Sequence, residues 1–406
     1  MKQALFISID GMTDPLGQSQ VIPYLAGLAR QGYRVTLISC EKKDKFKTAE
    51  KTIKDQLVRA GIEWQYCFYS KKIPLLSQRG NLHRLKKLAI AYAKENRGKF
   101  IAHCRSYLPA LIGLHLKKKY GARFVFDMRG FWADERVEGG IWKLSNPVHK
   151  SAYRYFKRKE KELILAADHI VTLTHAARKI LHSWFPEKKL KVTVIPCCSD
   201  LAHFTIKDPS QKLAARKKLH LPAAGFVIGY LGSTGTWYML DEMMDFFKEL
   251  LKQKPNSYFF FITQDDPQSI LRAAAQRKIP QARILIKAAA RAEVPGFISA
   301  LSAGLFFIRP SFSKQGSSPT KMAELLACGL PVITNAGVGD CDTVIQENNC
   351  GLVTKDFSAA GYHAALAQLD ACLAEDPAFF RRVAQEHFSL ESGVELYRSV
   401  YDHFSR

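Results

Sequence analysis

The sequence lacks any apolar run close to the roughly 20 residues that a membrane-spanning helix needs. It also lacks a Walker A loop and a G-x-G-x-x-G fingerprint, which argues against nucleotide hydrolysis and NAD binding. The nine cysteines are scattered, odd in number and without metal-like spacing, a usage typical of a reducing compartment. Residues 1–10 run into polar sequence with no cleavage signature, so we interpret them as a first strand and not as a signal peptide.

Negative charge is scarce in the first half of the chain. The whole sequence of 406 residues carries a net charge of +23, and residues 1–200 hold 38 Lys and Arg against 17 Asp and Glu, a balance of +21. A basic half of this kind indicates contact with a polyanion or an anionic membrane surface. Expected helices over residues 81–99 and 149–162 carry much of this charge, and a solvated face is the alternative interpretation.

Apolar strands alternate with helical patterns along the whole chain, which predicts parallel sheets built from βαβ units. Strands are expected at 4–9, 35–40, 101–104, 124–128, 169–174, 226–232, 259–263, 284–288, 304–308 and 331–335, with a helix over 18–33. We therefore predict an α/β chain of two Rossmann-like, doubly wound domains, 1–203 and 204–388, followed by a terminal helix over 389–406. Ligands of such sheets bind beyond the carboxyl ends of the strands, so we expect a site in the cleft between the domains.

Two strand-to-helix junctions in the first half hold candidate ligand-binding residues. Gly17 permits close backbone approach and Gln18 opens a helix, which fits either a loop against a donor phosphate or an ordinary turn. Asp127 and Arg129 follow an apolar strand, and an Arg in that position can bind phosphate or stabilise charge on a leaving group. We predict a catalytic role for both residues, with a structural Asp–Arg pair as the alternative.

Two further junctions lie in the second half. Residues 228–242 place Ser233 and Thr234 in a small nest of N–H and hydroxyl donors, an arrangement that can hold an anion. Residues 317–339 are more informative, because a hydroxyl-rich loop runs into a helix N-terminus there. Such a terminus is a ready site for phosphate. The candidate donor-binding residues around this terminus are Arg309, Lys314, Ser317, Ser318, Thr320, Lys321 and Glu324.

Lys321 and Glu324 indicate which kind of ligand this helix could bind. A cation such as Lys321 in the first turn is disfavoured by the helix dipole, and a bound anion would offset that cost. Glu324, one turn further on, is a carboxylate within reach of a hydroxyl-bearing ligand. Phosphate and hydroxyl groups side by side indicate a sugar nucleotide.

Taken together, these segments resemble the GT-B glycosyltransferases, specifically glycosyltransferase family 4. The resemblance is carried by DGMTDPLGQSQVIPYLAGLARQGYRVTLIS, DMRGFW, VIPCCSDLAHF and SSPTKMAELLACGLPVI. It implies an acceptor on the first domain, a nucleotide sugar on the second and a terminal helix that returns to the first domain. It also implies a retaining reaction with no metal and no cofactor other than the nucleotide-sugar donor, for which we expect a UDP sugar.

The resemblance also assigns roles by position. Glu324 matches the second glutamate of the family pair, which holds the ribose hydroxyls, whereas Gly316 stands where the first glutamate is expected. The family's basic residues on the diphosphate are absent near Ser233, so the phosphate charge would fall to Lys321, Arg129 or Arg309. Arg129 falls where many relatives have a histidine near the sugar.

We expect the acceptor to be a glycan or lipid-linked sugar of cell-surface polysaccharide or glycolipid synthesis. The enzyme would then be cytoplasmic and peripheral on the inner face of the membrane, held through the anionic surface that a +21 domain favours. A sugar-nucleotide epimerase on the same fold is the first alternative, but it needs clustered acids and a histidine that the motifs do not show. A nucleic-acid-binding protein is the second, although no RNA or DNA module is recognisable.

Overall fold

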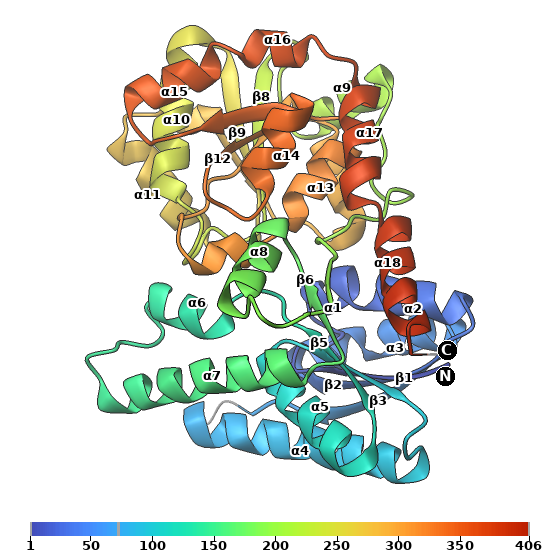
Figure 1. Ribbon diagram of the computed structural model, residues 1–406. Coiled ribbons are helices and arrows are strands. Elements are labelled where there is room, and N and C mark those ends of the chain that lie inside the picture. The colour runs from blue at the N-terminus through green and yellow to red at the C-terminus, as the bar shows by residue number, and fades with distance from the viewer. Residues whose placement is uncertain (1, 71–73, 405–406) are drawn as a thin grey trace. The chain divides into compact units, whose positions relative to one another are not determined.

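The computed structural model describes residues 2–70 and 74–404 and divides them into two compact units (Figure 1). Unit 1 comprises the described residues up to Pro196 together with those from Leu390 onward, and unit 2 spans Cys197–Ser389. Unit 2 therefore begins seven residues before the expected start of the second domain at 204. Each unit has its own hydrophobic core.

Unit 1 is built on a seven-stranded parallel sheet in the order β3-β2-β1-β4-β5-β6-β7. Its strands are β1 (Gln3–Ser8), β2 (Arg34–Glu41), β3 (Ile62–Phe68), β4 (Ile101–Arg105), β5 (Arg123–Asp127), β6 (His169–Thr172) and β7 (Val192–Val194). The central strands are apolar runs because helices cover both faces of a parallel sheet. The strands β3 and β7 lie outside the predicted set.

The helices of unit 1 connect these strands. They are α1 (Pro15–Gln20), α2 (Ile22–Arg30), α3 (Lys43–Arg59), α4 (Pro74–Glu95), α5 (Tyr107–Tyr120), α6 (Trp132–Glu138), α7 (Pro147–Ala166), α8 (His175–Trp184) and α18 (Leu390–Asp402). The single helix expected over 18–33 is divided between α1 and α2 at Val21, where the backbone leaves the helical region. Pro23 explains this break, because it has no N–H to donate to the Ser19 carbonyl four residues earlier and its ring would clash with that carbonyl in a continuous helix.

Unit 2 repeats the architecture with a six-stranded parallel sheet in the order β10-β9-β8-β11-β12-β13. Its strands are β8 (Phe226–Leu231), β9 (Ser257–Ile262), β10 (Ile284–Lys287), β11 (Ala303–Leu305), β12 (Val332–Asn335) and β13 (Gly351–Thr354). The α-helices are α9 (Pro209–Lys218), α10 (Leu240–Gln253), α11 (Pro267–Gln276), α12 (Val294–Ile298), α13 (Thr320–Ala327), α14 (Cys341–Asn348), α15 (Ala359–Leu366), α16 (Leu369–Leu373) and α17 (Pro377–Phe388). Short 3-10 turns cover η1 (Gln281–Arg283), η2 (Arg291–Glu293) and η3 (Ser313–Gly316).

The two sheets confirm the predicted α/β class with two Rossmann-like units. In each sheet the strand order reverses once, at the pair β1/β4 in unit 1 and at the pair β8/β11 in unit 2. Such switch points leave a crevice outside the carboxyl ends of the strands, where ligands of open α/β sheets bind. We therefore expect ligand sites at the loops that follow β1, β4, β8 and β11.

The terminal helix α18 packs against α2 within unit 1, although the two are far apart in sequence (Figure 1). Gly27 on α2 makes this contact possible, since a Cβ built there would lie 2.4 Å from a methyl carbon of Val394 on α18. Among the described residues, no helix is both long enough and apolar enough to cross a membrane.

Candidate functional site

Lys321, in the first turn of α13, is the most unusual side chain of unit 2. It is 5% exposed, and its ammonium nitrogen has no hydrogen-bond partner among the residues that the structure describes. Aromatic rings surround it instead, with the ring centroids of Tyr238 and Tyr230 at 3.5 and 4.1 Å. Burial holds the pKa of the Lys321 amine well below its usual range, and the nearby Glu324 carboxylate offsets only part of that effect. A buried amine without an acceptor is suited to receive an anionic ligand.

The surroundings of Lys321 also favour an anion. No side chain of the described residues caps the N-terminus of α13, and although the Met322 N–H donates to the Pro319 carbonyl, the N–H groups of Thr320 and Lys321 remain available. The ammonium lies beside the loop after β8, because a Cβ built on Gly232 would be 3.6 Å from its nitrogen. Gly232 also has a φ of +102°, which favours glycine. The backbone of this loop can therefore come close to whatever Lys321 binds.

Glu324 lies one turn along α13 and is paired with an arginine. The Nη1 atom of Arg291 approaches its Oε1 atom at 3.4 Å, and both side chains remain partly accessible. Burial raises the pKa of Glu324 above its usual value, although Arg291 opposes the shift. Arg291 is itself held by the segment that opens unit 2, with its guanidinium 5.5 Å from the ring of Phe204 and its carbonyl bonded to His203. Arg291 thus fixes the carboxylate that was predicted to hold a diol.

The nest predicted at Ser233 and Thr234 is already filled, which corrects that part of the prediction. Both hydroxyls donate to Oδ2 of Asp265, at 2.9 and 3.0 Å, and the Thr234 N–H donates to the same atom at 2.6 Å. Burial alone would raise the pKa of Asp265, but these hydrogen bonds outweigh it and lower the pKa. The carboxylate occupies the place where an outside anion would bind.

The other predicted donor residues lie near the same switch point with different degrees of exposure. Lys314 is buried in η3, with its ammonium 3.7 Å from the ring centroid of Trp237. Arg309 is exposed, and its backbone N–H donates to the Trp237 carbonyl. Ser318 is already used, because its hydroxyl accepts a bond from the Cys197 N–H at 3.1 Å. Two predicted residues, Ser317 and Thr320, are half-buried just before and at the start of α13.

In unit 1, charged side chains gather where β1, β4 and β5 end. The guanidinium of Arg105 lies 3.5 Å from the carboxylate of Asp10 and 4.0 Å from that of Asp127. Arg129 approaches the other oxygen of Asp127 at 3.8 Å and has a φ of +58°, a strained value for an arginine. The structure thus brings Asp127 and Arg129 together, as in the structural Asp–Arg pair that was the alternative interpretation.

Asp127 is too deeply buried to touch a substrate, which corrects its predicted catalytic role. It is 1% exposed, and its Oδ2 atom accepts a hydrogen bond from the Tyr397 hydroxyl on α18 at 3.1 Å and faces Nε2 of His103 at 3.5 Å. Burial alone would raise the pKa of Asp127, but Arg129 and His103 outweigh it and hold the pKa below its usual range. Asp127 therefore acts as a positioning residue that orients Arg129 and anchors α18.

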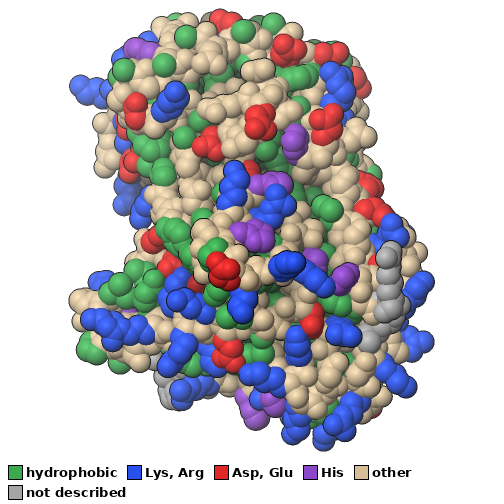
Figure 2. Space-filling model, viewed as in Figure 1, with side chains coloured by type: hydrophobic (Ala, Val, Ile, Leu, Met, Phe, Trp, Pro, Cys, Tyr) green, Lys and Arg blue, Asp and Glu red, His purple; other side chains and the backbone are tan. Residues whose placement is uncertain are grey.

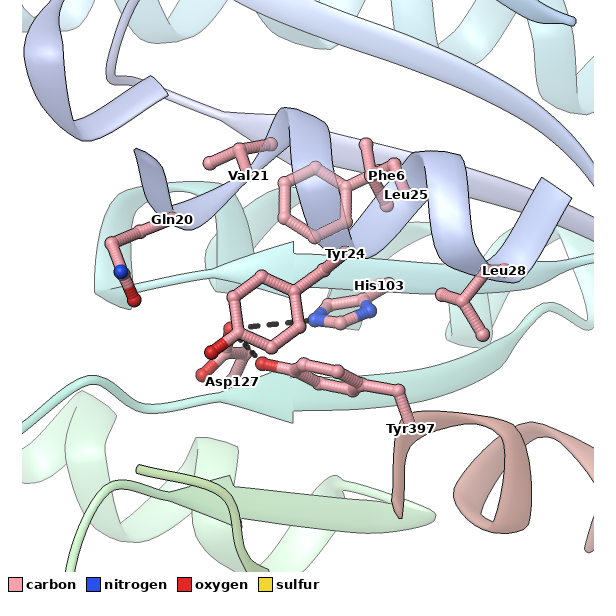
Figure 3. Close-up of a pocket in the computed structure, with 9 residues that line it drawn as sticks. All are labelled: Phe6, Gln20, Val21, Tyr24, Leu25, Leu28, His103, Asp127 and Tyr397. Carbon is pink, nitrogen blue, oxygen red and sulfur yellow. Dashed lines mark hydrogen bonds and ion pairs between the residues drawn. The ribbon is translucent and has the colours of Figure 1, made fainter. Parts of the chain in front are cut away.

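His103 connects Asp127 to a second tyrosine of α18. Burial lowers the pKa of His103, so the ring is neutral near neutral pH although Asp127 opposes the shift. A carboxylate can only accept, so the ring proton sits on Nε2, and Nδ1 accepts from the Tyr401 hydroxyl at 2.7 Å. A cavity of about 10 Å³ beside this cluster, lined by Gln20, Tyr24 and Tyr397 among others, has room for about one water and not for a sugar (Figure 3).

The loop that contains the other predicted residues of unit 1 is likewise closed by a carboxylate. Glu41, the last residue of β2, accepts hydrogen bonds from the backbone N–H groups of Met12 and Thr13 at 2.7 and 3.1 Å. Gly17 is required by packing, because a Cβ there would lie 2.3 Å from a backbone oxygen, and the Gln18 amide donates to the Thr13 carbonyl. These contacts describe an ordered βα turn, the alternative that the sequence left open.

Four of the charged residues that shape these places were not predicted from the sequence: Glu41, Arg105, Asp265 and Arg291. Each of them contacts a residue that is about 30 or more positions away in the sequence or that lies at the end of another strand. The signal available for three of them was their place at or just after an apolar strand, where polar side chains meet at one edge of a sheet.

The comparisons with known proteins agree with this architecture. The Glycosyltransferase Family 4 model matches residues 17–203, and the model for Glycosyl transferases group 1 matches residues 211–376. The chain therefore belongs to the family 4 type of GT-B glycosyltransferases, as the sequence resemblance predicted.

Individual relatives are distant. A D-inositol 3-phosphate glycosyltransferase of Stackebrandtia nassauensis is 26% identical over 221 residues, which are 52% of this chain and 48% of that protein. The match thus spans about half the length of this curated relative. The crystal structure of a Rickettsia africae glycosyltransferase has a TM-score of 0.70 at 16% identity, covering 100% of this chain and 98% of that one. Anabaena HepE in complex with UDP and glucose has a TM-score of 0.71 at 12% identity, with both chains covered completely.

Proposed function

We propose that this protein transfers a sugar from a nucleotide-diphosphate sugar to a glycan or lipid-linked acceptor. The observation that carries the proposal is Lys321, a buried ammonium with no hydrogen-bond partner among the described residues, at an uncapped helix N-terminus and one turn before Glu324. This arrangement offers charge to a diphosphate and a carboxylate to a ribose diol. The UDP and glucose bound to Anabaena HepE, a structure with the same fold, support a UDP-linked donor.

In this proposal, different residues of unit 2 bind different parts of the donor. Lys321 and the first amide groups of α13 bind the diphosphate, with the loop at Gly232 close by. Glu324, held by Arg291, accepts hydrogen bonds from the two ribose hydroxyls. Lys314 and Arg309 add positive charge at the same switch point. The Ser233–Thr234 nest takes no part while Asp265 fills it.

Arg129 is the residue of unit 1 that we propose to act on the reaction. Its guanidinium is fixed by Asp127 at the end of β5, and a fixed cation can stabilise the charge that develops on a leaving diphosphate. We also propose that the reaction retains anomeric configuration and proceeds without a metal ion, as the family resemblance implies. If Arg129 acts mainly in the transition state, Arg129→Ala lowers kcat far more than it weakens donor binding.

The test begins with the donor. A thermal-shift screen against a panel of nucleotide sugars identifies the base and sugar, because a ligand at 100 times its Kd stabilises by about 2.7 kcal/mol. The labelled donor found this way is then incubated with and without lipid-linked and soluble glycan acceptors. We expect a new glycosidic product only when acceptor is present, with retained configuration by NMR. Conversion of the donor into a different nucleotide sugar without acceptor would instead establish an epimerase.

A further inference from the structure

The α6–α7 hairpin, residues 132–166, extends to one side of the sheet of unit 1 (Figure 1). Its turn is fixed by Trp142, which is buried between Trp132 and Phe156 and whose backbone N–H donates to the Arg136 carbonyl at 2.8 Å. At the other end of the turn, the Asn146 side chain caps α7. The turn therefore presents its remaining side chains in a defined geometry.

Three of those remaining side chains are apolar and exposed. Ile141, Leu144 and Val148 are 55%, 42% and 54% exposed and lie within eight residues at the tip of the hairpin, although Trp142 between them is buried. Only twelve large hydrophobic side chains are strongly exposed among the described residues, and five of them, with Tyr155 and Leu165 included, belong to this hairpin. Single exposed apolar residues are ordinary, whereas a cluster marks an interaction surface.

Exposed, positively charged side chains lie along the same hairpin. The exposed cations are Lys143, Lys150, Arg154, Arg158 and Lys161, and none of them makes an ion pair within the part of the chain that the structure describes. The acids of α7 are already engaged, since Glu160 pairs with Lys157 and Glu162 pairs with Lys159 and Lys118. Figure 2 shows hydrophobic and Lys or Arg side chains next to one another over this segment.

We propose that the α6–α7 hairpin docks the protein on a lipid bilayer with anionic headgroups, with the tip inserted among the lipids and the cations of α7 on the headgroups. An apolar tip flanked by unpaired cations matches the interface of such a bilayer, which is apolar inside and negatively charged at its surface. Nucleic acid would use the cations but would leave Ile141, Leu144 and Val148 without a partner. The proposal rests on the proposed function in taking the acceptor to be lipid-linked.

The other basic helix that the sequence singled out is less suited to this role. On α4, Leu82 and Leu88 are half-buried against the unit, and none of its described side chains is among the strongly exposed large hydrophobic residues. Its cations Lys86 and Lys87 therefore have no apolar partner for insertion. This difference gives the experiment an internal comparison within unit 1.

The experiment measures partition of the full chain onto vesicles of phosphatidylcholine, with and without an equal amount of phosphatidylglycerol, in the absence of any sugar nucleotide. We expect binding only to the anionic vesicles. The variant I141S/L144S/V148S should bind about tenfold more weakly or worse at every salt concentration. The variant K150Q/R154Q/R158Q should lose about a hundredfold at low salt, since each cation near the surface contributes about fivefold, and less at high salt.

Matched controls separate the hairpin from the rest of the surface. V58S/L213S removes apolar residues of similar exposure elsewhere, and K86Q/K87Q removes cations of α4, so both should bind as the parent does. Parental binding by I141S/L144S/V148S, or loss confined to K86Q/K87Q, would overturn the proposal. So would tight binding of random single-stranded RNA that depends on the α7 cations and not on the tip. Because the thermal shift with a nucleotide sugar is measured without vesicles, it fails only if the donor site is wrong.

Discussion

The ammonium of Lys321 lies 3.5 Å from the ring centroid of Tyr238, inside a protein that offers it no hydrogen-bond acceptor among the described residues. A cation over an aromatic face gains some electrostatic stabilisation, but less than a carboxylate or phosphate would give. Burying Lys321 therefore lowers the stability of the ligand-free protein. This cost is recovered when an anion arrives, a trade that is common at functional sites.

Replacing Lys321 by methionine should raise stability and weaken donor binding. Methionine keeps the length and apolar stem of the side chain but removes the buried amine, so we expect unit 2 to gain about 1–3 kcal/mol in the absence of ligand. Calorimetry with UDP should show affinity reduced at least tenfold. Lys355→Met, at an exposed position of the same unit, is the control and should change neither quantity. Unchanged UDP affinity in Lys321→Met would remove this residue from the donor site.

Donor binding should take up a proton through Lys321. Burial depresses the pKa of this amine below the ordinary 10.5, and a bound diphosphate would raise it again. The affinity is then greatest below the pKa of the free protein and falls as pH rises from that value toward the pKa of the complex. Titrating UDP calorimetrically in two buffers of different ionisation enthalpy measures the uptake directly. Equal apparent enthalpies in both buffers at every pH would contradict the prediction.

If Glu324 binds the ribose hydroxyls, the protein should discriminate between UDP and 2′-deoxy-UDP. A charged hydrogen bond of this kind contributes about 1.5–3 kcal/mol, so we expect UDP to bind more than tenfold better than the deoxy compound. Glu324→Gln should bind UDP more weakly and lose most of that preference. Arg291→Gln should weaken both ligands, because the carboxylate loses the partner that holds it at 3.4 Å. A full ribose preference in Glu324→Gln would place the diol elsewhere.

Features of the fold that follow from residues close together in the sequence could be predicted, whereas those that depend on distant residues or on very short strands could not. The buried run of β9 and the apolar β5 were recognised because parallel strands covered on both faces are apolar throughout. The strand β3 was missed, since its residues IEWQYCF lie at the sheet edge, where only Ile62 is buried and the others are half-buried or exposed. β7 and β13 have only three and four residues and give little pattern.

The same distinction applies to the site. The helix N-terminus with Lys321 and Glu324 is a local pattern, four residues long, so the sequence could indicate it. The occupant of the Ser233–Thr234 nest could not be predicted, because Asp265 reaches it from the loop after a neighbouring strand. The Asp127–Arg129 pair was the alternative to a catalytic role, and the burial of Asp127 under Tyr397 depends on a helix that returns from the far end of the chain.

The last prediction concerns that returning helix. Tyr397→Phe removes a hydroxyl that donates to Asp127, which should cost unit 1 about 1–3 kcal/mol. Amides of α18 should then exchange faster by hydrogen–deuterium exchange, whereas Tyr155→Phe, at an exposed hydroxyl, should leave them unchanged. A carboxylate with a depressed pKa stabilises the fold above its ordinary value of 3.8 and loses that contribution as pH falls through the folded value. Because Tyr397→Phe raises the pKa of Asp127, the acid unfolding of unit 1 should move to higher pH. Identical exchange and acid unfolding in Tyr397→Phe and the parent would show that Asp127 does not anchor α18.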